Sequence, residues 1–212
     1  MKKIKILIAD DHPIVREGYK KILMDTTDMV VSDEAENGQE VLNYVRKKDY
    51  DLILLDISMP GRSGLEILKE LKGYKPKLPV LILSIYPEEQ YAVRAFRAGA
   101  SGYLTKASAP HELISAIRKI SAGGRYISSS MAEKLTYYLN ADAARPLHES
   151  LSDREYQVML MLASGKTVSE IADEICLSVK TISTYRSHIL EKMKLKNNAG
   201  ITLYAVQNKL IG

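Results

Sequence analysis

Five side chains that could handle a phosphoryl group stand where four short apolar segments end. They are three carboxylates, one hydroxyl and one ammonium, in the order Asp10, Asp11, Asp56, Ser84 and Lys106. The preceding segments are rich in Ile, Val and Leu, and helical patterns separate them, which is typical of buried parallel strands. The carboxyl ends of the strands in an open parallel sheet meet at one edge, so we expect these side chains to lie together.

This set of residue types suits metal-assisted phosphoryl transfer. Mg²⁺ prefers oxygen ligands, which Asp11 and Asp56 offer directly and Asp10 offers through water. A carboxylate can act as a nucleophile, so Asp56 is the candidate phosphoryl acceptor. The Lys106 ammonium and the Ser84 hydroxyl would hold the phosphoryl oxygens. The alternative for any single Asp is that it merely caps the next helix, but five such residues at four strand ends favour the phosphoryl site.

The elements that must position these residues are alternating strands and helices in residues 1–122. The predicted strands lie near 4–9, 29–34, 51–55, 79–83 and 101–104. The predicted helices lie near 13–24, 38–47, 63–72, 87–98 and 110–121. Turn residues such as Pro60-Gly61 separate them. This alternation predicts an α/β fold with a doubly wound parallel sheet and helices on both faces.

The remainder of the chain has no strand pattern. Gly123-Gly124 opens a segment that we interpret as a linker over 123–147, with one helix over 129–139. A small all-α domain is predicted over 148–212, with helices at 152–164, 167–174, 179–194 and 198–208. Ser152 and Glu155 have the spacing of a capping box at the first of these helices. The predicted domains are therefore 1–122, 123–147 and 148–212.

Two of these helices, joined by a tight turn, suit a helix-turn-helix whose second helix enters the major groove of double-stranded DNA. Its apolar face consists of Ile182, Tyr185, Ile189 and Met193. Candidate contacts to base edges are Ser183, Thr184 and Ser187, and candidate contacts to phosphates are Lys180, Arg186 and Lys192. The alternative is that this basic amphipathic helix is only a solvated surface.

Composition excludes several classes of protein. An apolar content of 46% supports packed cores rather than disorder. The apolar run after Met1-Lys2-Lys3 is short, so we expect no signal peptide, and we find no apolar stretch of the ~20 residues that a membrane span needs. Cys176 is the only cysteine, which excludes an intrachain disulfide, and its apolar neighbours predict a core position. We expect a cytoplasmic protein without membrane association.

Residues 1–122 resemble a response-regulator receiver domain. The matching segments read Ile-Ala-Asp-Asp-His-Pro at 8–13, Leu-Asp-Ile-Ser-Met-Pro-Gly at 55–61, Leu-Ser at 83–84 and Gly-Tyr-Leu-Thr-Lys at 102–106. The resemblance implies a flavodoxin-like (βα)5 fold and phosphorylation of Asp56 by a partner histidine kinase. It also implies that Mg²⁺ is bound by Asp10, Asp11, Asp56 and the Ser58 carbonyl.

The same resemblance implies a switch in which Ser84 moves toward the phosphoryl group and Tyr103 rotates inward. The alternative for Tyr103 is an ordinary half-buried aromatic side chain on an edge strand. Many receivers have a proline, often in a cis bond, after the conserved lysine, whereas Ala107 follows Lys106 here. We therefore predict no cis peptide bond in this loop.

The C-terminal domain resembles the LuxR-type helix-turn-helix. The resemblance rests on residues 151–155, 170–172 and 179–189, and with the receiver in front the chain is similar to NarL/FixJ-family response regulators over nearly its full length. It implies a homodimer on DNA, paired through the last helix around Ile201, Tyr204 and Ala205. The alternative is that Ile201 and Ala205 belong to the core of the domain. We expect the unphosphorylated receiver to cover residues 183–187 or the last helix.

Two other functions remain as alternatives. One is a metal-dependent phosphohydrolase that uses Asp56 as its nucleophile on small molecules, although no cap domain or separate substrate pocket is evident in the sequence. The other is an interaction module whose C-terminal helices bind protein. We predict a DNA-binding response regulator and not an enzyme.

Overall fold

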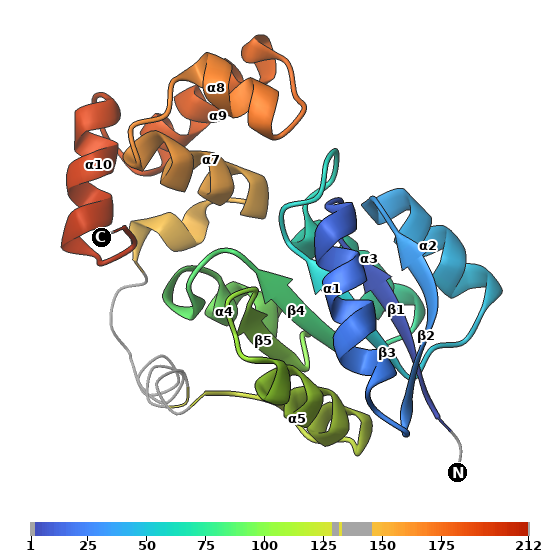
Figure 1. Cartoon of the computed structure of the whole chain (residues 1–212). Coiled ribbons are helices and arrows are strands. Elements are labelled where there is room, and N and C mark those ends of the chain that lie inside the picture. The colour runs from blue at the N-terminus through green and yellow to red at the C-terminus, as the bar shows by residue number, and fades with distance from the viewer. Residues whose placement is uncertain (1–2, 129–131, 133–145, 212) are drawn as a thin grey trace. The chain divides into compact units, whose positions relative to one another are not determined.

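The computed structural model describes residues 3–128, 132 and 146–211 (Figure 1). The chain divides into two compact units, residues 1–138 and residues 139–212, and each is described by itself. The helix predicted over 129–139 lies outside the described residues, apart from Ala132. Within the described part of the chain, no helix is both long enough and apolar enough to cross a membrane.

The first unit contains a parallel sheet of five strands in the order β2-β1-β3-β4-β5. The strands are β1 (Ile4–Ala9), β2 (Met29–Ala35), β3 (Leu52–Asp56), β4 (Val80–Ser84) and β5 (Gly102–Thr105). The chain runs outward from β1 to β2 and then crosses to the other side of β1, which makes β1 and β3 the point where the strand order reverses. This is the flavodoxin-like order, and it confirms the predicted doubly wound sheet.

Within residues 3–128, five helices cover the two faces of this sheet (Figure 1). They are α1 (Pro13–Met24), α2 (Gly38–Lys47), α3 (Gly64–Tyr74), α4 (Glu88–Arg97) and α5 (Pro110–Ser121). Helices α1 and α5 share one core with alternate residues of the strands, such as Ile6, Leu54 and Leu81. Helices α2, α3 and α4 lie on the opposite face. The helices predicted from the sequence are confirmed to within two residues at each end.

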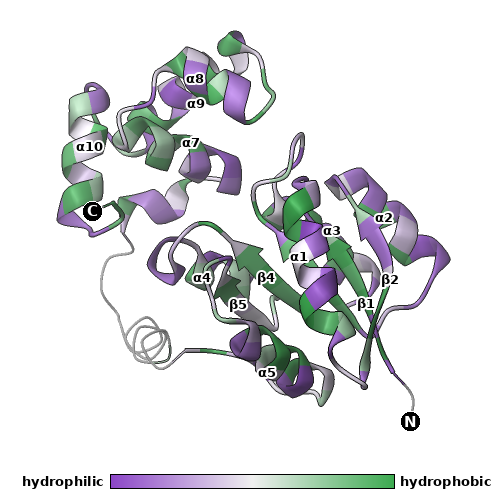
Figure 2. Cartoon of the chain, in the orientation of Figure 1, coloured by the Kyte–Doolittle hydropathy of each residue, from purple (hydrophilic) through white to green (hydrophobic). Residues whose placement is uncertain are grey.

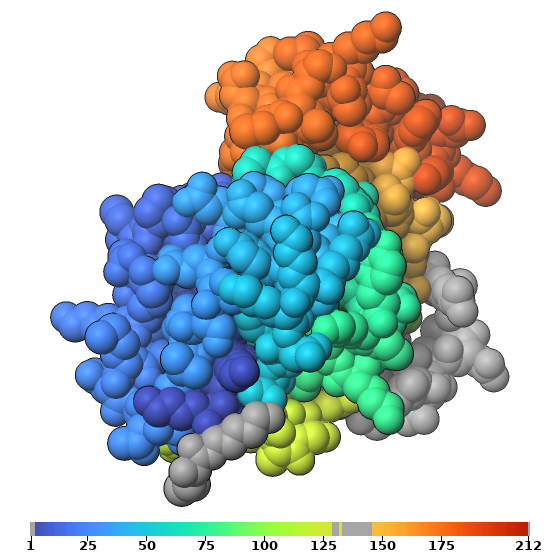
Figure 3. Space-filling view, turned by 90° about the vertical axis from the view of Figure 1, so that its right-hand side faces the viewer, coloured from blue at the N-terminus to red at the C-terminus, as the bar shows by residue number. Residues whose placement is uncertain are grey.

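The sheet is apolar because both of its faces are covered. All five residues of β3 and all five of β4 are buried, and β4 is coloured as hydrophobic in Figure 2. Burying one Leu or Ile side chain contributes about 1.5–3 kcal/mol. On the outside, α2 and α3 lie side by side (Figure 3), and Arg46 donates a hydrogen bond of 2.8 Å to the hydroxyl of Tyr74. The apolar interior thus provides the stability on which a polar strand edge can be built.

The first residues after α5 extend the sheet at β5. Tyr126 forms a parallel bridge with Gly102, and its N–H donates to the carbonyl of Ser101 at 2.9 Å. The hydroxyl of Ser128 bonds to the Glu88 carboxylate at the start of α4. The chain that follows α5 is therefore attached to both β5 and α4.

The second unit is helical. It contains a 3-10 helix η1 (Leu147–Ser150), which the sequence did not predict, followed by α7 (Asp153–Ala163), α8 (Val168–Glu174), α9 (Val179–Lys192) and α10 (Asn198–Gln207). Helix α7 packs against α8, α9 and α10, and Ile171, Ile182, Ile189 and Ile201 are fully buried. The predicted capping box at Ser152 and Glu155 is confirmed.

Cys176 is a correction to the sequence prediction. It is exposed, and not part of the core, because it lies in the turn between α8 and α9. Its backbone has φ 53°, in the left-handed region that turns require and that few residues adopt. The structure shows no cis peptide bond among the described residues, as predicted for the loop after Lys106.

Gly64 begins α3 where that helix meets the chain just after β3. A Cβ atom added there would lie 2.1 Å from the carbonyl oxygen of Asp56 and 2.8 Å from Cα of Ile57. We expect Gly64→Ala to lower the free energy of unfolding by about 1–3 kcal/mol, because the backbone of the Asp56 loop must shift. Urea unfolding followed by circular dichroism measures this change.

Gly73 in the same helix provides the matched control. Apart from its chain neighbours and the backbone of its own helix, nothing lies within 4 Å of an added Cβ at this position. Gly73→Ala should raise the free energy of unfolding by about 0.4–1 kcal/mol, because it restricts the unfolded chain without a clash. Equal stabilities for Gly64→Ala and the wild type would contradict the close approach of α3 to the Asp56 loop.

Candidate functional site

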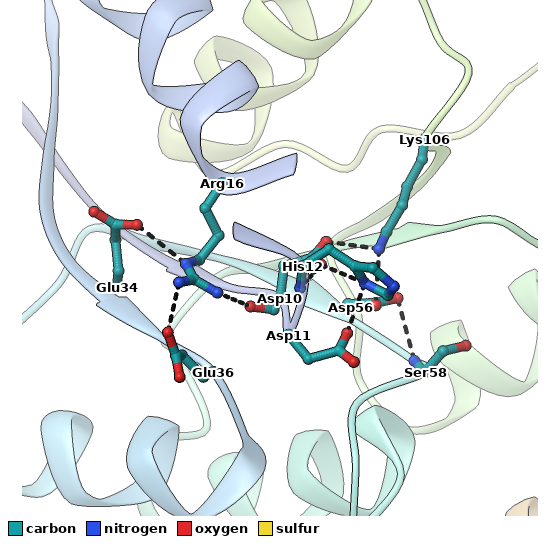
Figure 4. A network of polar contacts seen from close by, with 9 residues as sticks. All are labelled: Asp10, Asp11, His12, Arg16, Glu34, Glu36, Asp56, Ser58 and Lys106. Atoms are coloured by element: carbon teal, nitrogen blue, oxygen red, sulfur yellow. Dashed lines mark hydrogen bonds and ion pairs between the residues drawn. The ribbon is translucent and has the colours of Figure 1, made fainter. Parts of the chain in front are cut away.

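The carboxyl edge of the sheet gathers the acidic residues that the sequence predicted. Asp56 is the last residue of β3, and Asp10 follows β1 directly (Figure 4). Asp10, Asp11, His12 and Asp56 each offer one potential ligand atom, and these atoms all lie within 4.8 Å of one another. The strand reversal between β1 and β3 places this cluster at the position where open α/β sheets bind their ligands.

Lys106 joins the two buried carboxylates. Its Nζ atom lies 2.8 Å from Oδ2 of Asp56 and 2.6 Å from Oδ2 of Asp10. The side chains of Asp10 and Asp56 are each 1% exposed, whereas that of Lys106 is 11% exposed. The main chain holds Lys106 in place because its N–H donates to the carbonyl of Ser84 at 2.7 Å.

Burial and charge act against each other at this edge. Desolvation raises the pKa of Asp56, although Lys106 opposes the rise through its charge and its hydrogen bond. Desolvation alone would lower the pKa of Lys106, but the charges and hydrogen bonds of Asp56 and Asp10 outweigh it and raise that pKa. In the described part of the chain, the site therefore combines three carboxylates with the Lys106 ammonium, whose charged form these neighbours favour.

The carboxylates of this pocket form only part of the hydrogen bonds that their oxygens could accept. The N–H of Ser58 donates to Oδ1 of Asp56 at 3.2 Å, and the N–H of His12 donates to Oδ1 of Asp10 at 2.9 Å. Oδ1 of Asp11 is buried without a hydrogen bond, and its one ion-pair contact is with the His12 ring at 2.8 Å. Such carboxylate oxygens are ligands suited to a hard divalent cation.

The residues predicted as a switch lie beside this pocket. Ser84 is the last residue of β4 and is completely buried, and its Oγ accepts a hydrogen bond from the N–H of Tyr86 at 3.0 Å. The hydroxyl of Tyr103 donates to the carbonyl of Tyr86 at 2.8 Å. Tyr103 is on the edge strand β5 but is 0% exposed, so the half-buried alternative is wrong and its ring already points inward.

Arg16 contacts this site through the backbone of Asp10, and the sequence interpretation missed it. Its guanidinium donates to the main-chain carbonyl of Asp10 at 2.8 Å and pairs with Glu34 and Glu36 (Figure 4). A signal was present, because Arg16 lies in helical register with the buried residues Tyr19 and Leu23 of α1. A charged residue on the buried face of a helix needs a partner.

The second unit presents the predicted polar face of α9. Lys180, Ser183, Thr184 and Ser187 are exposed, and of the predicted apolar face Ile182, Ile189 and Met193 are buried. The hydroxyls of Thr184 and Ser187 donate to carbonyls of their own helix, at 3.0 and 3.1 Å. Helix α8, the turn at 175–178 and α9 form the predicted helix-turn-helix.

Two of the predicted phosphate-binding cations have partners within the domain. Nε of Arg186 donates to Oδ1 of Asn198 at the start of α10 at 2.7 Å. Nζ of Lys192 lies 2.8 and 2.7 Å from the two carboxylate oxygens of Glu155. Partial desolvation acts to raise the pKa of Glu155, but the hydrogen bonds from Lys192 and Ser152 outweigh it and hold the pKa below its ordinary value.

On the last helix, the residues predicted to pair subunits divide into two groups. Ile201 and Ala205 are fully buried within the unit, while Tyr204 bonds through its hydroxyl to the ring of His148 at 2.9 Å. Leu203 and Val206 are apolar and exposed on the same helix, by 59% and 54%. The core alternative is thus correct for Ile201 and Ala205.

Comparison with known proteins agrees with both halves of this description. A family model described as a response regulator receiver domain matches residues 6–118, and one described as bacterial regulatory proteins of the luxR family matches residues 149–205. The chain is 36% identical to the response regulator GacA of Pseudomonas aeruginosa over 98% of both chains. It is 34% identical to the response regulator UvrY of Escherichia coli, over 98% of this chain and 95% of UvrY.

Solved structures show the same combination of domains. An RcsB response regulator of Salmonella typhimurium matches with a TM-score of 0.69 and 26% identity, over 98% of this chain and 99% of RcsB. RcsB of Salmonella enterica serovar Typhimurium, bound to a promoter in the presence of the phosphomimetic BeF3⁻, matches with a TM-score of 0.61 and 27% identity, over 96% and 98%. The chain therefore belongs to the NarL/FixJ family of response regulators, with a receiver domain followed by a LuxR-type helix-turn-helix domain.

Proposed function

We propose that this DNA-binding response regulator is controlled by phosphorylation of Asp56 by a sensor histidine kinase. The observation that carries this proposal is the Lys106 ammonium between the buried carboxylates of Asp10 and Asp56, at the carboxyl edge of the sheet. A nucleophilic carboxylate with a cation at hydrogen-bond distance is the arrangement that phosphoryl transfer to Asp requires.

The pocket suits Mg²⁺ as the metal ion. Three carboxylates face one ammonium, so negative charge remains to be neutralised, and Oδ1 of Asp11 has no hydrogen bond of its own. The residues that would hold the ion are Asp10, Asp11, Asp56 and the carbonyl of Ser58. A bound Mg²⁺ neutralises charge that develops on the transferred phosphoryl oxygens.

The transfer itself is a displacement at phosphorus. A carboxylate oxygen of Asp56 attacks the phosphorus atom of phosphohistidine, the P–N bond breaks, and the electron pair stays on the imidazole nitrogen. Lys106 lies 2.8 Å from Asp56 and would remain paired with the anionic product. Ser84 would donate a hydrogen bond from its hydroxyl to a phosphoryl oxygen, and a movement of Oγ toward that oxygen would weaken the hydrogen bond that it accepts from the N–H of Tyr86.

This movement of Ser84 would supply the switch. Tyr86 bonds to Ser84 through its N–H and to Tyr103 through its carbonyl, so a movement of Ser84 changes the support of the Tyr103 ring. We propose that the aspartyl phosphate stabilises one arrangement of this loop and that the inward Tyr103 belongs to it.

The domain division 1–122, 123–147 and 148–212 stays a proposal, supported by the family matches to 6–118 and 149–205.

For the output, we propose that a homodimer places α9 in the major groove of double-stranded DNA. Ser183, Thr184 and Ser187 would contact base edges, and Lys180 would contact phosphates from its exposed position. Arg186 and Lys192 remain proposed phosphate contacts, although each would first have to share or leave an intradomain partner. The half-sites of a dimer lie ~10 base pairs apart, or a multiple of that spacing.

We place the protein in the cytoplasm, where the kinase domain and DNA are accessible, and we propose no membrane association. The family consists of DNA-binding regulators, which argues against the phosphohydrolase alternative. The exposed polar face of α9 argues against the protein-binding alternative, because an interaction module would present apolar side chains there.

The phosphoryl acceptor can be tested with Asp56→Asn. With Mg²⁺ and a small phosphodonor, the wild type should form an acid-labile phosphoryl adduct, and Asp56→Asn should form none because the nucleophilic oxygen is lost. Intact-protein mass spectrometry measures the adduct. Asp49→Asn removes a surface carboxylate whose side chain is 97% exposed, and it should behave as the wild type. An adduct of unchanged yield on Asp56→Asn would refute the assignment.

The coupling of the two domains can be tested with Mg²⁺ and beryllium fluoride. The mimic should tighten binding to duplex DNA and shift the mass in solution from monomer to dimer, because it favours the phosphorylated arrangement of the receiver. Fluorescence anisotropy and sedimentation measure the two effects. Asp56→Asn should show neither effect. If the wild type binds DNA equally tightly with and without the mimic, the receiver does not control this output.

The contacts to DNA can be sorted by their dependence on sequence and salt. Ser183→Ala should reduce discrimination between sequences by about 1–3 kcal/mol with little change in nonspecific affinity. Lys180→Ala should weaken binding to all sequences and reduce the salt slope by about 1. Lys192→Ala should also weaken all binding uniformly, but it should lower the melting temperature as well, because Glu155 loses its partner. Equal loss of preference in all three variants would contradict this sorting.

A further inference from the structure

Arg16 is a charged residue that is almost fully buried inside the receiver. Its side chain is only 9% exposed, and it lies between α1 and the chain at the end of β2 (Figure 4). A buried guanidinium is costly unless its charge and its donors have partners. Glu34 and Glu36 provide the charge, at 3.1 and 2.6 Å.

The third partner of this guanidinium belongs to the acidic pocket. Nη1 of Arg16 donates to the main-chain carbonyl of Asp10 at 2.8 Å, while Nε and Nη2 bind the two Glu carboxylates. The planar guanidinium offers donors in several fixed directions, so one side chain can bond to three separate acceptors. A lysine ammonium could keep the charge but not this geometry.

The Asp10 carbonyl needs such a donor because the sheet no longer provides one. The last residue of β1 in register with its neighbours is Ala9, which pairs with Ala35 and Leu55. The N–H of Asp10 still donates to the carbonyl of Ala35 at 3.1 Å, and Arg16 receives the carbonyl. Both peptide groups of Asp10 are thereby held.

Holding these peptide groups determines where the carboxylates point. From this fixed backbone, Asp10 reaches Lys106 at 2.6 Å, and the following peptide carries Asp11 into the same pocket. Rotation of the peptide between Asp10 and Asp11 would change the direction in which the carboxylate of Asp11 enters the pocket. Groups that orient metal ligands without touching the metal commonly change its affinity by about 10–100-fold.

We propose that Arg16 is a positioning residue for the metal and phosphoryl site, acting through the main-chain carbonyl of Asp10. The inference rests on the proposed function, because it assigns Arg16 to the pocket in which Asp56 accepts its phosphoryl group. The competing explanation is that Arg16 only fastens α1 to β2 through Glu34 and Glu36. That explanation predicts a loss of stability without a change in the affinity for the metal ion.

The test compares variants of the full-length chain. Arg16→Met keeps the apolar stem, and Arg16→Lys keeps the charge without the guanidinium geometry. Lys20→Met is the matched control. Like Arg16, Lys20 forms an ion pair with Glu34, at 2.7 Å. Its other ion pair is with Glu17, on the surface of α1, and not with the acidic pocket. Calorimetric titration with Mg²⁺ gives the Kd, and thermal unfolding gives the melting temperature.

Arg16→Met should raise the Kd for Mg²⁺ by about tenfold or more. Arg16→Lys should raise it by a smaller factor, and Lys20→Met should leave it at the wild-type value even where its melting temperature falls. If Arg16→Met proves unfolded by circular dichroism, the comparison of Arg16→Lys with Lys20→Met decides the question. Slower phosphorylation by a small phosphodonor at subsaturating Mg²⁺, restored at saturating Mg²⁺, should accompany the raised Kd.

Two results would overturn the proposal. One is a lower melting temperature with an unchanged Kd in both Arg16 variants, which would leave Arg16 a purely structural role. The other is an equal rise of the Kd in Arg16→Lys and Lys20→Met, which would trace the effect to Glu34 instead of Asp10. A wild type that shows no saturable Mg²⁺ binding would instead refute the metal site of the proposed function itself.

Discussion

The receiver depends on one interaction, the sharing of the Lys106 ammonium by the two buried carboxylates of Asp10 and Asp56. Both carboxylates are almost fully removed from water, and an unpaired buried charge is strongly destabilising. The single cation therefore ties together the ends of β1 and β3 and the loop after β5. These three segments are far apart in sequence and must meet within hydrogen-bond distance for the charges to be tolerated.

Burial of the apolar sheet offsets the free-energy cost of placing charged side chains at its edge. The strands behind the site are buried on both faces, so the stabilisation from apolar burial offsets the cost of placing charged groups at their ends. The edge can then keep negative charge that its own cation does not neutralise. Excess negative charge of this kind favours binding of a divalent cation, and a bound cation would in turn offset the added negative charge of a phosphoryl group.

In the helix-turn-helix unit, some basic side chains of α9 are bonded within the domain and others are exposed. Lys192 and Arg186 are bonded to Glu155 and Asn198, so part of the basic character of α9 holds the domain together. The exposed polar side chains Lys180, Ser183, Thr184 and Ser187 remain on the outer face. A count of basic residues along the helix could not separate these roles, because an ion pair within the domain and a contact to phosphate use the same residue types.

The sequence by itself determined the order of the elements and the acidic site. Apolar runs of strand length alternate with helical patterns, and the carboxyl ends of parallel strands must share one edge, so Asp10, Asp56 and Lys106 could be brought together without coordinates. Their residue types led to the proposal of phosphoryl transfer assisted by a metal ion. The predicted juxtaposition of these side chains is confirmed because periodicity and strand direction are local properties of the chain.

Contacts between distant segments were decided only by the tertiary structure. Arg16 is recognisable in the sequence as a charge on a buried helix face, but its three acceptors come from the ends of β1 and β2, which only the folded chain brings to it. The exposure of Cys176, the full burial of Tyr103 and the pairing of Lys192 likewise follow from how helices and strands pack. Residue type and spacing limit what a side chain can bind, but the partner that it does bind depends on which other segments the hydrophobic core places beside it.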